Sequence, residues 1–299
     1  MAGKWKGQTR GGALGYLFFI YLIRWLGVRA AYAFLCLVVT YFIPFAPKAT
    51  RSVWVYSRRI LRQGRLRSVG FLFRNYYRLG QTLIDKVAVQ AGMKDRYRFQ
   101  FENYDEFLRI LNADTGVVVI GAHIGNWEIG SPFFDEYGKK INIVMFDNEH
   151  RRIKEILESN KEIMPDFKVI GVRNGSLDHV FQITEALDKH EYVCFQGDRY
   201  VNEDKLLSAS FMGRETQFPQ GPFLLASRLR KPVVFYFAMR ERHRTYRFHF
   251  FVADPVAGRT DGQPLLRQYV TVLEKMVRKY PEQWFNYFDF WNIMKNNKD

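Results

Sequence analysis

Hydrophobic and polar residues alternate in blocks from about residue 97 to residue 279, and these blocks predict strands and helices in turn. Apolar runs rich in β-branched and aromatic residues predict strands at 97–101, 117–120, 141–146, 168–171, 191–196, 233–239 and 246–252. Amphipathic blocks predict helices at 105–111, 127–137, 149–159, 176–187, 221–228 and 263–279. The turn-rich residues 211–222 are interpreted as a loop that leads into a helix. Strands that alternate with helices indicate an α/β fold, a layered mixed sheet flanked by helices.

The amino-terminal third has a different pattern. Two apolar runs, Leu14–Ile23 and Ala30–Phe45, are separated by Arg24 and Arg29. Each run is shorter than the roughly 17–25 residues that a membrane-spanning helix needs. We therefore expect residues 1–90 to form a hydrophobic, helical membrane anchor, either a re-entrant or an interfacial hairpin, and residues 91–299 to form the α/β catalytic domain.

Charge strengthens the membrane interpretation. The net charge is +15, and residues 1–84 contain fourteen Lys and Arg and no acidic residue. Basic residues flank the apolar runs on both sides, which favours a hairpin with both ends in the cytoplasm, and each adds about 1 kcal/mol of attraction to an anionic leaflet. Nucleic acid is not expected as a partner, because the arginines flank aliphatic stretches and do not alternate with stacking aromatics.

The chemistry is expected where the apolar strand 117–120 ends, because ligands of open α/β sheets bind at the carboxyl ends of the strands. His123 and Glu128 follow that strand. They are five positions apart and would diverge on one continuous helix, so they meet only if the chain turns at Gly125 and Asn126. With that turn, Glu128 is expected to hold one ring nitrogen of His123 and leave the other nitrogen as a general base.

A second polar segment follows the apolar strand 191–196. Asp198 and Arg199 are expected beside the same site, where they would clamp a phosphate or orient an acceptor; an ion pair in a surface turn explains them equally well. The histidines show no metal-ligand spacing, Cys36 and Cys194 are too few for a cysteine zinc site, and no dinucleotide glycine pattern is present. No metal or cofactor is expected.

Four segments, taken in order, resemble the lysophospholipid acyltransferase superfamily, and within it the lipid A biosynthesis branch of late lauroyl and myristoyl acyltransferases. They are Gly-Ala-His-Ile-Gly-Asn-Trp-Glu at 121–128, Gly-Asp-Arg at 197–199, Phe-Met-Gly at 211–213 with Phe-Pro-Gln-Gly-Pro at 218–222, and Pro-Glu-Gln-Trp at 281–284. The resemblance covers residues 95–291. It implies a glycerolipid-acyltransferase-like core, a His-x4-acid dyad, and a place on the cytoplasmic face of the bacterial inner membrane.

The resemblance also implies the reaction. An acyl chain would pass from an acyl carrier protein or acyl-CoA thioester to a hydroxyl or amine of a membrane lipid. After Trp284 the lipid A enzymes usually have an arginine-containing tail, whereas this chain continues Phe-Asn-Tyr-Phe-Asp-Phe-Trp. The acceptor therefore stays open between lipid A and another lipid or pigment, as do the acyl chain length, the choice of donor and the oligomeric state.

The expected mechanism is direct transfer, with His123 as general base and the backbone N–H groups near Gly125 and Asn126 stabilising the oxyanion. Two other functions remain open from the sequence. A membrane-surface esterase or thioesterase would use the same dyad to activate water. A non-catalytic basic membrane adaptor would bind in a salt-sensitive way without turnover.

Overall fold

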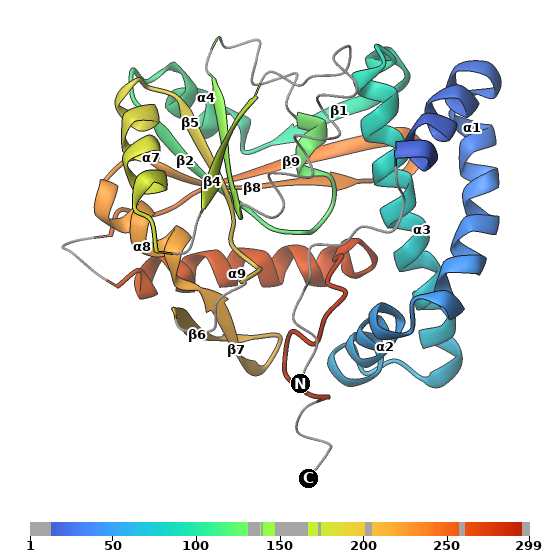
Figure 1. Cartoon of the computed structure of the whole chain (residues 1–299). Coiled ribbons are helices and arrows are strands. Elements are labelled where there is room, and N and C mark those ends of the chain that lie inside the picture. Colours follow the sequence, from blue (N-terminus) through green and yellow to red (C-terminus); the bar gives the residue numbers. More distant parts are fainter. Residues whose placement is uncertain are drawn as a thin grey trace.

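The computed structural model describes residues 13–130, 138, 140–146, 167–172, 175–200, 205–256 and 261–294. Its centre is a seven-stranded mixed sheet in the order β1-β9-β8-β2-β5-β3-β4 (Figure 1). The strands are β1 (Arg98–Glu102), β2 (Val117–Gly121), β3 (Ile141–Phe146), β4 (Phe167–Val172), β5 (Tyr192–Gln196), β8 (Val233–Arg240) and β9 (Thr245–Val252). Only β8 and β9 pair antiparallel; the other neighbours in this sheet are parallel.

Helices cover both faces of the sheet, as its two apolar faces require. The helices α1 (Ala13–Phe45), α3 (Arg65–Gln90) and α4 (Tyr104–Asn112) pack on one face, against alternate residues of β2 such as Val117 and Val119. The helices α7 (Asp178–Asp188), α8 (Gln220–Leu229) and α9 (Gln263–Lys279) pack on the other, against Val118 and Ile120. The α/β fold predicted from the sequence is confirmed.

The predicted elements match closely where the structure describes them. All seven predicted strands are present, with ends shifted by at most two residues. The predicted helix 149–159 lies outside the described residues, and of 127–137 the structure describes a short 3₁₀ helix, η3 (Trp127–Gly130). One prediction is wrong: part of the segment interpreted as a loop belongs to a β-hairpin, β6 (Leu206–Phe211) with β7 (Arg214–Pro219). Met212 and Gly213 make its turn, both with positive φ.

The amino-terminal helix α1 contains both predicted apolar runs. It changes direction at Gly27, whose φ of 79° and ψ of 169° are not helical. The part Tyr21–Phe45 is long and apolar enough to cross a membrane, although each run alone is too short. Helix α2 (Pro47–Val55) and the π-helical turn η1 (Tyr56–Ile60) then lead into α3, which packs along α1 (Figure 1).

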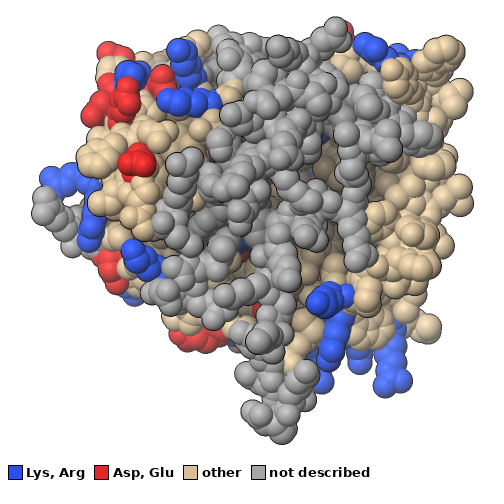
Figure 2. Space-filling model, viewed as in Figure 1, with Lys and Arg blue, Asp and Glu red and all other residues tan. Residues whose placement is uncertain are grey.

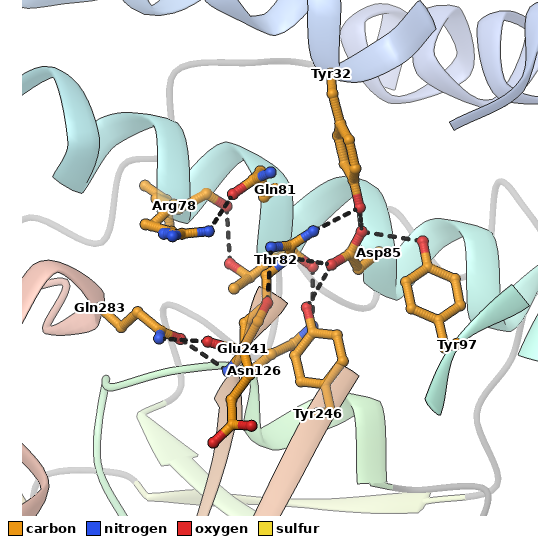
Figure 3. A network of polar contacts seen from close by, with 12 residues as sticks. Tyr32, Arg78, Gln81, Thr82, Asp85, Tyr97, Asn126, Glu241, Tyr246 and Gln283 are labelled. Atoms are coloured by element: carbon orange, nitrogen blue, oxygen red, sulfur yellow. Dashed lines mark hydrogen bonds and ion pairs between the residues drawn. The ribbon is translucent and has the colours of Figure 1, made fainter. Parts of the chain in front are cut away.

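A buried polar network ties this amino-terminal region to the sheet (Figure 3). The Asp85 carboxylate of α3 is fully buried and accepts hydrogen bonds from the hydroxyls of Tyr32, Tyr97 and Tyr246 and from the Arg240 guanidinium. The Tyr97, Tyr246 and Arg240 bonds measure 3.0, 2.6 and 2.8 Å. Removing one partner of a buried ion pair leaves an uncompensated charge and costs about 3–5 kcal/mol. This network therefore fixes α1 and α3 against β8 and β9; the domain boundary near residue 90 stays a prediction.

Candidate active site

The chain makes the predicted turn immediately after β2. Gly125 has a φ of +66°, in the region that favours glycine. A Cβ at this position would lie 2.2 Å from the carbonyl oxygen of Ala238, so no other residue fits without movement of β8. The turn lets the chain reverse between His123 and Glu128, as the sequence predicts.

Backbone hydrogen bonds join the carboxyl-terminal segment to the loop that contains His123. The Phe285 N–H donates to the His123 carbonyl at 2.8 Å, and the Gly125 N–H donates to the Gln283 carbonyl at 3.0 Å. Trp284, between them, is buried and forms a bridge with Ile124. Segments about 160 residues apart in the sequence therefore fix the backbone of the loop.

The imidazole of His123 has a carboxylate partner, and that partner is Asp198. The distance from Nδ1 of His123 to Oδ1 of Asp198 is 2.7 Å, and the His123 backbone N–H donates to Oδ2 at 2.9 Å. The Asp198 side chain is fully buried, whereas His123 is 24 % exposed. The two oxygens of one buried carboxylate thus fix both the ring and the backbone of His123.

Burial and charge together set the protonation states of the pair. Burial and the nearby Arg199 guanidinium lower the pKa of His123 below its usual value, although Asp198 pulls it upward. Burial alone would raise the pKa of Asp198, but the contacts with His123 and the charge of Arg199 make the net shift downward. We therefore assign an ionised Asp198 that accepts Nδ1–H from a neutral His123, which leaves the lone pair on Nε2.

Glu128 does not hold the ring, which corrects the role given to it from the sequence. Its carboxylate pairs with Lys86 of α3, with 2.5 Å between Oε2 and Nζ. Glu128 lies in the first turn of η3 and pairs with α3, while Asp198, just after the neighbouring strand β5, occupies the Nδ1 side of His123. Glu128 still affects His123 electrostatically, because its negative charge raises the pKa of the imidazole. No local sequence signal identifies Lys86, because it lies on a distant amphipathic helix.

The expected oxyanion donors are already engaged. The Gly125 N–H is bonded to Gln283 as described, and the Asn126 N–H donates to the Ala238 carbonyl at 2.8 Å. The Asn126 side chain is buried, and its Nδ2 donates to the carbonyl of Thr82 at 2.9 Å (Figure 3). Asn126 therefore fastens the loop to α3, and the oxyanion role predicted for these two N–H groups is wrong for this conformation.

Arg199 lies near the pair and is bonded to the carboxyl-terminal segment. Its Nη2 donates to the Phe285 carbonyl at 2.9 Å, and its charge lowers the pKa of both His123 and Asp198. The sequence placed Asp198 and Arg199 together as substrate-binding residues. In the structure the two residues have different partners. Asp198 contacts the imidazole, and Arg199 bonds to the carboxyl-terminal segment.

A pocket opens beside these residues on the face of the sheet that α3 covers. The volume of the pocket, including the open space at its entrance, is about 610 Å³. Apolar side chains supply most of its wall, among them Val119, Trp127, Ile141, Ile143, Phe167 and Tyr236. Gly121, Glu128 and Gln196 bring the pocket to the ends of β2 and β5, next to the His123–Asp198 pair.

A thiol nucleophile and a metal ion are two other ways to activate a reacting group. Burial raises the pKa of the Cys194 thiol, which lines the pocket, to about 12, so that it is not a thiolate nucleophile near neutral pH. Within the described ranges, no group of three or more His, Cys, Asp or Glu side chains is placed to hold a metal ion.

Comparison with known proteins gives three findings. The family model described as "Bacterial lipid A biosynthesis acyltransferase" matches residues 57–291. The crystal structure of the 1-acyl-sn-glycerophosphate (LPA) acyltransferase PlsC from Thermotoga maritima aligns over 84 % of this chain and 97 % of that chain, with 15 % sequence identity and a TM-score of 0.38. No curated protein matches the chain in sequence.

Proposed function

Because the chain belongs to the family of bacterial lipid A biosynthesis acyltransferases, we propose that this lipid acyltransferase takes its acyl chain from a thioester of acyl carrier protein or coenzyme A. The acceptor is a hydroxyl or amine of a membrane lipid, and His123 is the general base. The observation that carries the catalytic part is the bond between Nδ1 of His123 and the buried Asp198 carboxylate, which leaves Nε2 as the basic nitrogen.

The reaction proceeds by direct transfer. Nε2 of His123 removes the proton from the acceptor hydroxyl as its oxygen attacks the thioester carbonyl carbon, and a tetrahedral oxyanion forms. Asp198 stabilises the imidazolium created in this step. When the oxyanion collapses, the C–S bond breaks, and the thiolate takes the proton from the imidazolium. The products are the acylated lipid and a free thiol, and His123 is neutral again.

The pKa shift of His123 suits this role. A general base must be unprotonated before the reaction, and the lowered pKa keeps the imidazole neutral at pH 7. The charge of the buried Asp198 carboxylate and its hydrogen bond at Nδ1 raise the pKa of the ring and partly offset this lowering. The pair thus resembles the His–Asp part of a hydrolase triad, with the acceptor hydroxyl in the place of the nucleophile.

The pocket gives the acyl chain a site. Its apolar wall runs over β2, β3, β4, β5 and β8, and Gly121 and Gln196 line it at the ends of β2 and β5, two residues before His123 and Asp198. A thioester bound with its carbon chain along the wall places its carbonyl group at the polar end. Burying methylene groups there contributes about 0.8 kcal/mol for each group.

The membrane side is proposed from the surface of α1. Its inner residues, including Ile23, Ala31 and Leu35, are buried against the domain, while its outer residues are exposed and apolar: Trp25 is 83 % and Leu37 68 % exposed. The right-hand flank in Figure 2, where Figure 1 places α1, shows mostly uncharged atoms. An outer apolar face on a helix whose inner face is packed suits a domain that rests sideways in the leaflet.

Exposed arginines support the same placement. Lys and Arg side chains project from the lower right of the molecule, near α2 (Figure 2). The exposed basic residues of this region are Lys48, Arg51, Arg59, Arg62, Arg65 and Arg67. Facing an anionic leaflet, they would hold the domain on the cytoplasmic face of the inner membrane.

Mass spectrometry of cell lipids tests the proposal. Cells that lack the protein are compared with cells that carry the wild type or His123→Ala. We expect one lipid class to lose a single acyl chain in the deletion strain and in the variant, with restoration only by the wild type. Unchanged lipids together with a loss of free fatty acid would contradict the proposal and favour a membrane-surface esterase.

A further inference from the structure

The active site needs a donor for the oxyanion, and the backbone groups expected to supply it are bonded elsewhere. The Gly125 N–H donates to Gln283, and the Asn126 N–H donates to Ala238. A tetrahedral intermediate that develops a negative charge is usually stabilised by preorganised hydrogen-bond donors, and losing one such donor costs about 10²–10³ in kcat. A side-chain donor in the pocket would fill this role.

Gln196 is placed for it. It ends β5, and its strand pairs in register with β2 so that Gln196 lies opposite Gly121. Asp198 follows Gln196 by two residues, and His123 follows Gly121 by two residues. Gln196 and its strand partner Gly121 are therefore each close in sequence to one residue of the catalytic pair.

The carboxamide of Gln196 lies close to Gly121. A Cβ on Gly121 would be in van der Waals contact with it, 3.5 Å from Oε1 and 3.6 Å from Nε2. Gln196 also lines the pocket, together with Gly121 and Glu128. The pairing of β2 with β5 thus brings one amide to this end of the pocket.

The carboxamide oxygen of Gln196 has no partner among the described residues: Oε1 is buried and accepts no hydrogen bond there. Leaving a buried polar atom unpaired costs about 1–3 kcal/mol, and such exceptions in native structures are typical of functional groups. Gln90 lines the same pocket from the end of α3 and carries the same side chain.

We propose that Gln196 is a further catalytic residue, whose Nε2–H donates to the thioester carbonyl oxygen and stabilises the oxyanion that forms when the acceptor attacks. This inference rests on the proposed acyl transfer. It assigns the base to His123, just after β2, and the oxyanion donor to Gln196, at the end of the adjacent strand β5.

Steady-state kinetics with purified full-length protein in lipid vesicles test the proposal. The variants are Gln196→Ala, which removes the donor, and Gln196→Glu, which keeps the shape but replaces the donor with an acceptor. Gln100→Ala is the matched control, because Gln100 is exposed on β1 and does not line the pocket. We expect kcat to fall about 100-fold or more in both Gln196 variants while KM for the acyl thioester stays within about threefold. The control should keep kcat within about threefold.

Binding of an S-alkyl coenzyme A thioether separates catalysis from positioning, because this analogue has the chain but no carbonyl oxygen. Its Kd should be the same in the wild type and in Gln196→Ala. The proposal is overturned if either Gln196 variant that keeps the wild-type melting temperature retains kcat within threefold, if the loss appears in KM alone, or if Gln100→Ala loses as much. A wild type that hydrolyses thioesters without acylating any lipid would instead overturn the proposed function, and the assignment to acyl transfer with it.

Discussion

Replacing Asp198 with Asn tests how the base is held. The carboxylate accepts two hydrogen bonds from His123, at 2.9 Å from the backbone N–H and at 2.7 Å from Nδ1. An amide has only one acceptor oxygen. Either the backbone N–H loses its partner, or the amide NH₂ donates to Nδ1 and forces the proton onto Nε2, where it blocks the base.

The expected loss follows from these contacts. Each hydrogen bond to a charged group contributes about 1.5–3 kcal/mol, and general-base catalysis contributes about 10²–10⁴ in rate. We therefore expect Asp198→Asn to lower kcat by about 10²–10⁴. Glu128→Gln is the matched control, because Glu128 is paired with Lys86 and makes no hydrogen bond to the ring; its loss should stay below about tenfold.

The pH profile supplies a second readout. Activity requires neutral His123, so kcat/KM falls as the pH drops through the pKa of the imidazole, which lies below its ordinary value of 6.5. The charge and hydrogen bond of Asp198 raise that pKa. Removing the charge therefore moves the acid limb of the profile to still lower pH in Asp198→Asn.

The test is to measure initial rates over pH 4–8 for the wild type and both variants. Melting temperatures show whether each variant is folded. The reasoning is refuted if folded Asp198→Asn keeps the wild-type rate and acid limb, or if Glu128→Gln loses more activity than Asp198→Asn.

Three further changes probe the loop, the buried network and the membrane face. Gly125→Ala places a methyl group 2.2 Å from the Ala238 carbonyl oxygen at a φ of +66° and should lower the unfolding free energy by about 1–3 kcal/mol; an unchanged denaturation midpoint would contradict the tight turn. Tyr32→Phe removes one donor to the buried Asp85 and should cost about 1.5–3 kcal/mol in the same measurement; no loss would mean that the network does not hold α1. Leu37→Glu on the exposed face of α1 should weaken sedimentation with anionic vesicles about tenfold or more, because burial of a leucine contributes about 1.5–3 kcal/mol; equal sedimentation would argue against contact of this face with lipid.

The sequence predicts the sheet well because its strands are short, apolar on both faces and separated by amphipathic helices. Strand β2 has five buried residues in a row, and the carboxyl end of such a strand is where chemistry is expected. His123, Asp198 and Arg199 were found in this way. The β6–β7 hairpin was missed because its turn, Met212-Gly213, has only one glycine, and its strands mix polar and apolar residues.

The pairing of the side chains could not be predicted locally. Sequence spacing offered Glu128 as the partner of His123, but the register of β2 with β5 brings Asp198 to the ring instead. Lys86 of α3 then takes the Glu128 carboxylate. Both contacts depend on which strand and which helix lie next to the loop, and that is a property of the whole fold.

The carboxyl-terminal segment gives a similar example. The tail after Trp284 suggests only an aromatic end of the chain, yet the N–H of Phe285 and the carbonyl of Gln283 form the hydrogen bonds that frame the His123 loop. These bonds also occupy the Gly125 N–H that was expected to stabilise the oxyanion. A backbone group cannot be assigned to catalysis before its partners in the fold are known.

The rate of acyl transfer by purified His123→Ala, measured beside the wild type in vesicles of the lipid class identified in cells, tests the central claim most directly. We expect the variant to fold with an unchanged melting temperature and to form acylated lipid at least 100 times more slowly than the wild type. Formation of acylated lipid within a few-fold of the wild-type rate would contradict a base at Nε2 of His123.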